Sequence, residues 1–469
     1  MEVWKLTGIV LVIVIMASMV TGWSKAEEAG DIIVFTNVNV IPMDEERVLS
    51  DQTVIIRDGR INKVGSTSLI KVPSGAIEID GTGQYLIPAL SDMHVHMIGL
   101  DYNLLFPPQA QFTAEDLDYN KILFPYVANG VAIVATMTAL EDQLTLRDQI
   151  AQGEVLGPRL ILNRMIDAPE KAFPEPVAVW VDDDASARQA VLDAKEAGYD
   201  GIKAYGFLNR ESYDSILATA KEVGLPVNGH IPVELSVEHV LEAGQNHIVH
   251  VEEVTRVAQG DFSPERIDYF AGIIAASDTW VSPTLVTTRK ILALFDDPEK
   301  EFARPEMRYA QHPMEQAFMS FLLNRYMSMP EEHRQGIRDG FEQFGLPLTR
   351  ALLDKGVKML TGTDTGLPAL VSGFALHDEL EELVAAGLTP YQALRASTTN
   401  PFEFLGELEE AGTIEVGKLA NLVLLEANPL ENISNTQRIA GVMIQSRWLS
   451  KVEIKAGMDE VVAYFDSFK

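Results

Sequence analysis

Short apolar runs that predict β-strands alternate with helical patterns through the middle of this 469-residue chain. Two of the helical patterns, over residues 186–198 and 211–224, close on a glycine, which is typical of a helix C-cap. Strands that alternate with helices form parallel sheets, and eight such units close into a barrel. The sequence therefore predicts an α/β fold with a (β/α)8 TIM barrel over residues 87–411. The eight predicted strands are residues 86–95, 131–136, 159–162, 200–204, 226–229, 247–251, 280–286 and 357–361.

Both ends of the chain carry β-type patterns. Residues 32–85 hold several short apolar strands, with Asp58-Gly59 as a hairpin turn signal. The C-terminal segment continues in the same way. Such short segments can pair only if the barrel brings the two ends together. We therefore expect one composite β-sandwich domain, formed by residues 27–86 and by residues 412–469, the latter with a terminal helix.

One long segment, at about residues 288–348, lacks a strand signal. It is rich in Met, Phe and charged residues, which predicts helices inserted after the seventh strand. Two interpretations remain open for these helices. They pack on the outside of the barrel, or they form a lid over the end of the barrel where active sites lie.

The first residues have the pattern of a secretory signal peptide. Lys5 precedes an apolar run over residues 6–20, and the small residues Ser24 and Ala26 follow before a polar segment. We expect cleavage after residue 26 and export to the periplasm or the exterior. The alternative is an uncleaved membrane anchor, but a run of about 15 residues is shorter than the roughly 20 that a span needs.

Composition excludes several classes of function. The chain has no cysteine, so it has no disulfide, no thiolate zinc site and no cysteine nucleophile. Its formal net charge of −31 argues against binding to nucleic acid, because phosphate backbones need clustered positive charge. Apart from export, nothing in the composition indicates a membrane partner.

The histidines fall where a barrel builds its active site. His94 and His96 come at the end of the first predicted barrel strand, and residues two apart in a strand point to one face. Imidazoles and carboxylates without thiolates suit Zn²⁺ or a similar divalent ion in a water-accessible site. Four further residues with suitable or modifiable side chains lie at or near the ends of other predicted strands, namely Lys203, His230, His250 and Asp364.

Several stretches together resemble the amidohydrolase superfamily, in its imidazolonepropionase-like and Xaa-Pro-dipeptidase-like branch. The resemblance covers about residues 32–455. It rests on LIPALSDMHVHM (86–97), DGIKAYG, NGH, HIVHVEE, GTDTG and the C-terminal run HDELEELVAAGLTPYQALRASTTNPFEFLG (377–406).

The resemblance implies a centre of two divalent ions, with Zn²⁺ as the expected metal. His94, His96 and Asp364 would hold the more buried ion, and His230 and His250 the more exposed one. Lys203 would be N-carboxylated and bridge both, because an ammonium repels a cation whereas a carbamate oxygen binds it. A bridging hydroxide would then attack a carbonyl carbon, with Asp364 as general base and then general acid.

Substrate contacts are less well defined by the sequence. Tyr205 lies two residues after Lys203 and so shares its inward face, and His377 resembles a position near the pocket of this branch. Strand periodicity points His247 away from the pocket, which predicts a structural role. Glu252 and Glu253 lie close enough in sequence to reach His250.

Two segments depart from the pattern of the branch. The run VATMTAL (134–140) lacks the Arg-Asp pair that many relatives carry, and NRMIDAPEKAFPEP (163–176) lacks a histidine. Both follow barrel strands and would face the substrate, so they put Xaa-Pro specificity in doubt. Ala89 replaces a glycine before the HxH motif.

We therefore expect an exported hydrolase of a C–N bond in an amide, a cyclic amide or a small peptide. One alternative is a mononuclear, imidazolonepropionase-type hydrolase of a cyclic amide. An alternative of another class is a non-catalytic binding protein on an amidohydrolase fold. Relatives often form homo-oligomers, which the resemblance allows for this chain as well.

Overall fold

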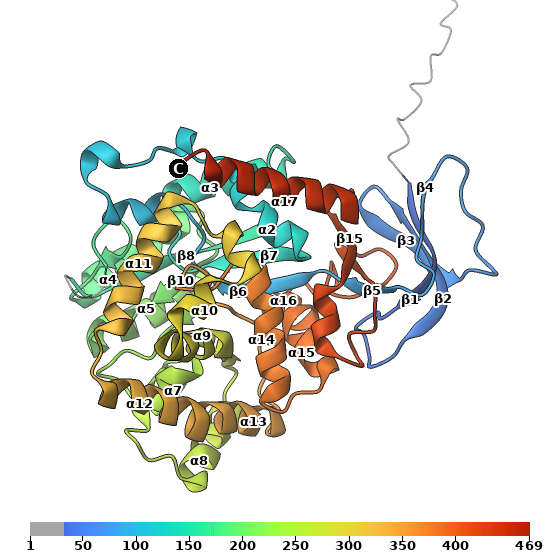
Figure 1. The fold of residues 1–469 in the computed structure, drawn as a ribbon. Coiled ribbons are helices and arrows are strands. Elements are labelled where there is room, and N and C mark those ends of the chain that lie inside the picture. Colours follow the sequence, from blue (N-terminus) through green and yellow to red (C-terminus); the bar gives the residue numbers. More distant parts are fainter. Residues whose placement is uncertain (1–31, 170, 172) are drawn as a thin grey trace, which may run out of the picture.

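A computed structural model describes residues 32–169, 171 and 173–469. The predicted signal peptide lies outside the described residues. The chain forms a barrel surrounded by helices and a separate sheet beside it, in which blue N-terminal strands and red C-terminal strands meet (Figure 1). The predicted α/β barrel with a composite β-domain is therefore confirmed.

Seven parallel strands form most of the barrel, and each pairs with the next one along the chain. The eighth position is occupied by residues 359–365, which no regular strand includes. This segment closes the ring through parallel bridges from Met359 to Val281 and from Thr365 to Val95. The seven strands are β6 (Leu90–Val95), β7 (Val131–Thr136), β8 (Arg159–Asp167), β10 (Gly201–Ala204), β11 (Val227–Gly229), β12 (His247–Val249) and β13 (Trp280–Ser282), and β9 (Val179–Trp180) pairs with β8.

Helices follow the strands with the caps that the sequence predicts. In α4 (Asp184–Ala197), Asp183 accepts a hydrogen bond from the backbone N–H of Ser186, and Gly198 ends the helix with φ of 91°. The helix α5 (Arg210–Val223) ends on Gly224 in the same left-handed conformation. The other helices up to β13 are α1 (Tyr119–Ile122), α2 (Phe124–Ala128), α3 (Glu141–Ala151), α6 (Val237–Ala243), α7 (Val251–Val257) and α8 (Pro264–Ala275), with the 3₁₀ helices η1 (Leu100–Leu105), η2 (Pro108–Ala110) and η3 (Ala114–Asp116).

The predicted insertion after the seventh strand is helical. Its longest helix, α11 (Pro313–Met327), lies against η1, and the rings of Phe318 and Tyr102 meet there with centroids 4.9 Å apart. The insertion comprises α9 (Leu285–Asp296), α10 (Pro298–Phe302), η4 (Pro305–Tyr309), α11, α12 (Glu331–Gly340), the π-helix η5 (Phe341–Gly345) and α13 (Leu346–Asp354).

The remaining helices are α14 (Phe374–Ala385), α15 (Pro390–Ser397), α16 (Thr399–Phe404), η6 (Ile433–Gln437) and α17 (Lys451–Asp466). Phe404 of α16 packs edge-on against Trp280 and His247, the first residues of β13 and β12. The helix α16 thus covers the N-terminal end of these strands, and the opposite end is left for function. Among the described helices, none is both long and apolar enough to cross a membrane.

The second sheet joins the two ends of the chain. Strand β5 pairs with β1 on one side and antiparallel with β14 on the other. Phe35 on β1 and Trp448 on β16 meet at 5.1 Å although three strands lie between them, so this continuous sheet folds over its own core. Its strands are β1 (Ile33–Val40), β2 (Leu49–Arg57), β3 (Arg60–Ser66), β4 (Ile77–Asp80), β5 (Tyr85–Pro88), β14 (Leu422–Leu425), β15 (Ile439–Ile444) and β16 (Arg447–Ser450).

The two longest predicted strands are shortened. The run 86–95 is divided at Ala89, whose N–H binds the carbonyl of Asn421 in the second domain, whereas the next N–H, of Leu90, binds Gly130 beside the barrel. The run 280–286 ends as a strand at Ser282, because α9 begins at Leu285. Neither boundary could be predicted from the apolar runs, because both depend on which segment the backbone forms hydrogen bonds with.

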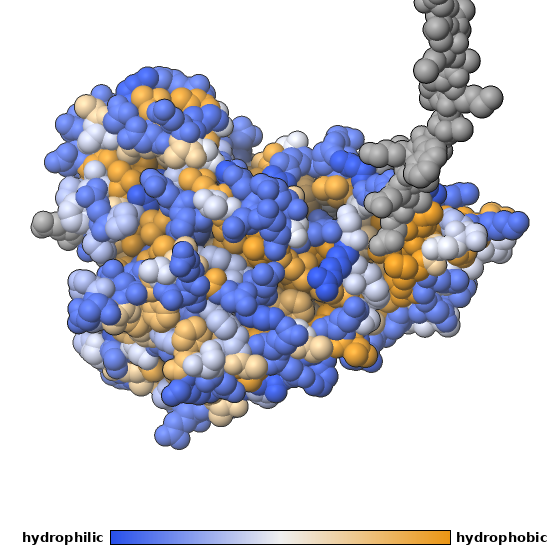
Figure 2. Space-filling view, turned by 90° about the horizontal axis from the view of Figure 1, so that it is seen from above, coloured by the Kyte–Doolittle hydropathy of each residue, from blue (hydrophilic) through white to orange (hydrophobic). Residues whose placement is uncertain are grey.

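The outer surface agrees with the acidic composition. Figure 2 shows hydrophilic residues over most of one face, with smaller hydrophobic groups between them. A net charge of −31 spread over such a surface favours solubility and does not by itself define a site.

Candidate metal centre

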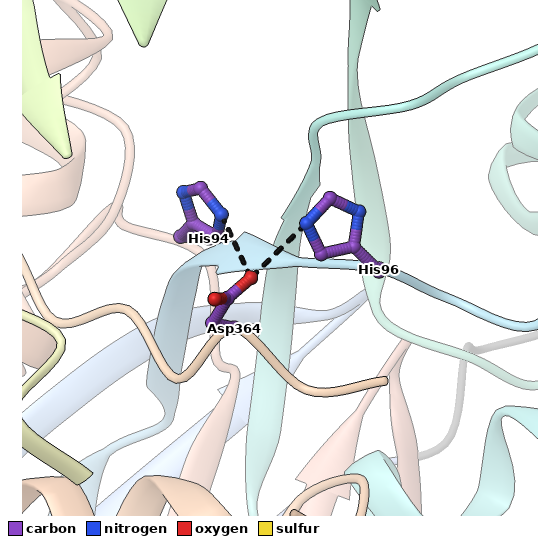
Figure 3. A group of neighbouring side chains, drawn as sticks. All are labelled: His94, His96 and Asp364. Carbon is purple, nitrogen blue, oxygen red and sulfur yellow. Dashed lines mark ion pairs between the residues drawn. The ribbon is translucent and has the colours of Figure 1, made fainter. Parts of the chain in front are cut away.

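Three side chains converge at the C-terminal end of the barrel. His94 is in β6 and His96 follows this strand by one residue, while Asp364 comes from the segment that closes the barrel (Figure 3). One carboxylate oxygen, Asp364 Oδ1, lies 3.1 Å from His94 Nε2 and 3.0 Å from His96 Nε2. One ligand atom from each residue lies within 4.8 Å of the others, which is the spacing that a shared metal ion requires.

The backbone around Asp364 is shaped for this approach. The N–H groups of Thr363 and Asp364 both bind the carbonyl of His94, at 3.1 and 2.8 Å. A Cβ on Gly362 would lie 2.7 Å from the Cβ of His94, and a Cβ on Gly366 would lie 2.8 Å from the carbonyl oxygen of His96. Glycine is therefore needed at both positions if the two segments are to touch.

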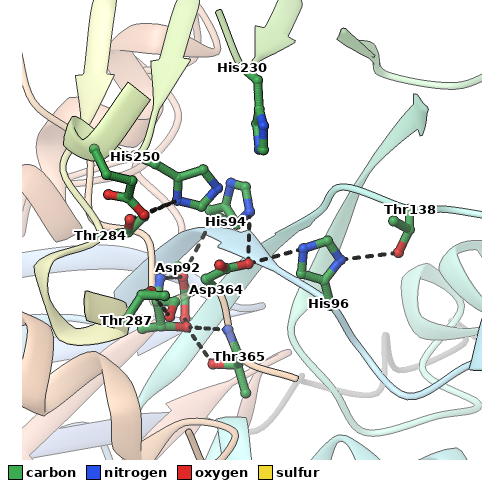
Figure 4. A network of polar contacts seen from close by, with 12 residues as sticks. Asp92, His94, His96, Thr138, His230, His250, Thr284, Thr287, Asp364 and Thr365 are labelled. Carbon is green, nitrogen blue, oxygen red and sulfur yellow. Dashed lines mark hydrogen bonds and ion pairs between the residues drawn. The ribbon is translucent and has the colours of Figure 1, made fainter. Parts of the chain in front are cut away.

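His250 and His230 extend the group away from Asp364. Each follows its strand, β12 or β11, by one residue. The ring of His250 lies 4.5 Å from that of His94 and 5.0 Å from that of His230, so the three rings form a continuous cluster (Figure 4). The strand ends thus bring together four imidazoles that the sequence separates by up to 156 positions (250 − 94).

Lys203 lies in β10 with only 1% of its surface exposed. Burial lowers the pKa of its ammonium to about 7, although the carboxylate of Asp364 favours the charged form. The amine is therefore substantially neutral near physiological pH.

Four polar atoms of the cluster lack partners within the described part of the chain. His94 Nδ1 and Nε2, Asp364 Oδ1 and Lys203 Nζ are buried without a hydrogen bond. Such atoms cost free energy unless something else binds them. Burial also lowers the pKa of His94 well below its ordinary value and that of His250 to about 3, so both rings are neutral, as metal ligands must be. The donor set therefore fits a divalent metal.

Three residues at this place also have a strained backbone. Asp364, His250 and Thr284 have φ of 58°, 67° and 50°, a left-handed region that residues other than glycine rarely adopt. Strained residues of this kind persist where the surrounding structure holds them for function.

The match to known proteins agrees with this site. The model of the amidohydrolase family matches residues 85–449, which include every residue of the cluster. The chain belongs to the amidohydrolase family. Its predicted class, a hydrolase acting on carbon–nitrogen bonds, agrees with this membership.

Solved structures share the fold of this amidohydrolase. A protein from Bifidobacterium longum described as a prolidase is 23% identical with a TM-score of 0.69, covering 92% of this chain and 99% of its own. A Xaa-Pro dipeptidase with bound methionine is 20% identical with a TM-score of 0.68 (90% and 100% covered). Bottromycin amidohydrolase is 20% identical with a TM-score of 0.72 (92% and 90%). At these identities the likeness concerns the fold.

One curated relative is similar over a short stretch. The enamidase of Eubacterium barkeri is 40% identical over 55 residues, which are 12% of this chain and 14% of the enamidase. The amidohydrolase described here thus matches only a small part of that enzyme's length.

The other predicted residues have different environments in this amidohydrolase. The ring of Tyr205 lies 4.4 Å from that of His230, so Tyr205 is beside the centre. His377, predicted as a substrate contact, is buried, with Nδ1 3.0 Å from the hydroxyl of Thr436 in η6. His247 is buried and bonded to Ser282, as expected for a structural residue.

Sequence reasoning missed most of the groups that contact the histidines from outside. His96 Nδ1 lies 3.3 Å from Thr138 Oγ1, and His250 Nδ1 lies 2.8 Å from Thr284 Oγ1 (Figure 4). Of the two acids weighed for His250, Glu253 in fact lies beside His230, with Oε1 3.2 Å from Nδ1. The only sequence signal for these partners was a polar residue shortly after a predicted strand. Many polar residues in such positions contact no histidine, so this signal was too weak to identify them.

Proposed function

We propose that this chain is an exported, metal-dependent amidohydrolase that cleaves a C–N bond in a small amide, cyclic amide or peptide. The observation that carries the proposal is the position of Asp364 Oδ1 between His94 Nε2 and His96 Nε2, among buried polar atoms without partners. Export rests on the leader pattern over residues 1–26.

Two divalent ions, with zinc as the expected metal, would be held by this cluster. His94, His96 and Asp364 would hold one ion and His230 and His250 the other, with Lys203 between them. When bound, the metal lowers the pKa of a water molecule and polarises a carbonyl group. Asp364, the acid of the cluster, would accept a proton from the attacking water and deliver it to the leaving nitrogen.

Lys203 would act as an N-carboxylated residue. Its neutral amine attacks CO₂, a bond forms between Nζ and carbon, and the nitrogen loses one proton to water, which leaves an anionic carbamate. The lowered pKa of the amine supports this step, since only the neutral form reacts.

A mononuclear centre is the second candidate, favoured by one observation. Among the described residues, the ligand atoms that lie within 4.8 Å of one another come from only three residues, His94, His96 and Asp364. A single ion would need no carbamate, so Lys203 would remain unmodified.

The substrate is proposed to be a small peptide or peptide-like amide. The names of the solved relatives, prolidase, Xaa-Pro dipeptidase and bottromycin amidohydrolase, support this class. The two segments that depart from the family pattern, residues 134–140 and 163–176, lie at the ends of barrel strands and would set the specificity within this class.

The inserted helix α11 is proposed as a lid over this end of the barrel. Burial and the nearby carboxylate of Asp364 raise the pKa of Tyr326, near the end of α11. Tyr326 is therefore within range of the charge of Asp364, which supports a position of α11 on this side of the barrel.

The decisive experiment is metal analysis followed by assays on dipeptides, N-acyl amino acids and lactams. We expect two equivalents of zinc in the wild type, fewer in His230→Ala, and loss of hydrolysis in Asp364→Asn. One equivalent in the wild type, unchanged in His230→Ala, would favour the mononuclear candidate. Unchanged hydrolysis of every substrate by Asp364→Asn would overturn the proposed catalysis, and no bound metal in the wild type would favour a non-catalytic binding protein.

A further inference from the structure

Two of the clustered histidines have a threonine partner placed in the same way. His96 follows β6 by one residue, and Thr138 follows the neighbouring strand β7 by two. His250 follows β12 by one residue, and Thr284 follows the neighbouring strand β13 by two. In both cases Nδ1 faces the hydroxyl oxygen, at 3.3 and 2.8 Å. Both contacts therefore arise in the same way, between residues that follow two neighbouring parallel strands at the C-terminal end of the barrel.

The direction of the hydrogen bond between His96 and Thr138 follows from a second hydrogen bond, between Thr138 and Asp101. The Thr138 hydroxyl donates a hydrogen bond to Asp101 Oδ2 at 3.0 Å. When Asp101 is ionised its carboxylate has no proton to give, and the hydroxyl has only one, so Thr138 Oγ1 then accepts from His96 Nδ1–H. The lone pair of His96 is then on Nε2, which faces Asp364 Oδ1 at 3.0 Å.

In the contact between His250 and Thr284, the position of Thr284 is held by the surrounding backbone. Thr284 is fully buried, has φ of 50° and immediately precedes α9. The start of α9 is held by Glu379, whose carboxylate accepts the N–H of Val286 at 2.7 Å. The nearest acid to His250 Nδ1, Glu252, is 3.8 Å away, beyond hydrogen-bond distance, so the hydroxyl is the partner.

His230 differs from these two histidines. Its Nδ1 lies 3.2 Å from a carboxylate oxygen of Glu253, which also binds Arg256. Within the cluster, only His96 and His250 have such a threonine contact, and each of these would belong to a different metal subsite of the proposed function.

We propose that Thr138, oriented by Asp101, and Thr284 are matched positioning residues that set the tautomers of His96 and His250. Each hydroxyl holds the proton on Nδ1 and turns Nε2 toward the metal, one threonine for each subsite. This inference rests on the proposed metal-dependent function. Partners of this kind change metal affinity strongly although they do not touch the ion.

Zinc affinity of the full-length protein, measured by competition with a chelator, tests the proposal. Thr138→Val keeps the shape and removes the hydroxyl, and we expect about 10- to 100-fold weaker binding at the His96 subsite alone. Thr284→Val should weaken the His250 subsite alone. The serine variants Thr138→Ser and Thr284→Ser retain the hydroxyl. Their zinc affinity should stay within about threefold of the wild type, well short of the loss expected for the valine variants.

Ser282→Ala provides the matched control. It removes the hydroxyl partner of His247, a buried histidine outside the proposed ligand set. It should lower stability and leave zinc affinity unchanged, so a general packing effect is separated from the proposed one.

Asp101→Asn tests the direction of the hydrogen bonds. An amide N–H can donate to Thr138 Oγ1, which would turn the hydroxyl proton toward His96 and favour the wrong tautomer. We expect weaker zinc binding and a shift of the His96 ring ¹⁵N resonances toward the Nε2–H form in the metal-free protein. Wild-type affinity in both valine variants, or failure of both serine variants to restore binding, would overturn the inference. Absence of zinc binding by the wild type would overturn the proposed function itself.

Discussion

Asp92 binds Thr363 with both carboxylate oxygens. Oδ1 accepts the backbone N–H at 3.0 Å and Oδ2 accepts the hydroxyl at 2.6 Å. Since Asp92 is in β6 and Thr363 precedes Asp364, this pair joins the strand that carries two histidines to the segment that carries the acid. The relative position of the three clustered side chains therefore depends on one buried carboxylate.

Asp92→Asn should weaken this connection. The amide places an N–H opposite one of two donors, so one hydrogen bond is lost and a buried donor is left without a partner. We expect the free energy of unfolding to fall by about 1–3 kcal/mol and the zinc content to fall with it. Urea unfolding and metal analysis measure both, with the exposed Asp193→Asn as control. A variant with full zinc content and wild-type stability would show that the pair has no such role.

Gly366→Ala should disrupt the centre through a steric clash. The new Cβ would lie 2.6 Å from the hydroxyl oxygen of Tyr102, and φ at this position is 114°. We expect loss of zinc binding and destabilisation by about 2 kcal/mol or more. Gly417→Ala is the matched control, because φ is 97° there and no atom lies within 4 Å of the added carbon. If Gly366→Ala and Gly417→Ala bind zinc equally well, the predicted clash at Gly366 does not disrupt the centre.

Carboxylation of Lys203 predicts that zinc uptake depends on CO₂. Metal-free protein should take up the second equivalent faster with bicarbonate than in CO₂-free buffer, and native mass spectrometry should detect one added CO₂. Lys203→Ala should lose at least one equivalent and regain part of it with a small carboxylate such as propionate. Equal zinc uptake with and without bicarbonate, together with an unmodified mass, would instead support the mononuclear centre.

Glu315 should make stability depend on pH. Burial raises the pKa of its carboxyl from 4.5 to about 8, and Oε2 has no hydrogen-bond partner among the described residues. Between these values the folded protein keeps a proton that the unfolded chain has released. The stabilising contribution is therefore complete below about pH 4.5 and is lost as pH rises through about 8, with a slope of at most about 1.4 kcal/mol per pH unit.

Glu315→Gln, which does not ionise, should flatten this dependence and raise stability at alkaline pH. Urea unfolding between pH 5 and pH 9 (roughly the window set by the two pKa values) measures it. The exposed Glu342→Gln in the same insertion is the control. A wild-type slope in Glu315→Gln would assign the pH dependence to other groups.

The sequence predicted the parts of this protein that depend on local periodicity. Alternating apolar runs and glycine caps predicted the barrel, and the HxH spacing placed His94 and His96 at the end of β6. His230 and His250 were placed in the same way, because parallel strands bring their C-terminal ends to one side of a barrel. Tyr205 was found because it continues the inward face of Lys203.

Contacts between distant segments could not be predicted in this way. Thr138 meets His96 across 42 positions, and Asp92 meets Thr363 across 271. His377 faces Thr436 because the C-terminal part of the chain packs on α14, which no local pattern records. The division of the run 86–95 at Ala89 likewise depends on which sheet offers a partner.

The sequence by itself therefore determined the class of fold, the strand ends that carry the clustered histidines and the absence of thiol chemistry. Only the tertiary structure decided which oxygen lies between which imidazoles and which hydroxyl holds each ring. The physical reason is that periodicity sets the face on which a side chain lies, whereas hydrogen-bond partners depend on the register of strands and the path of loops between them.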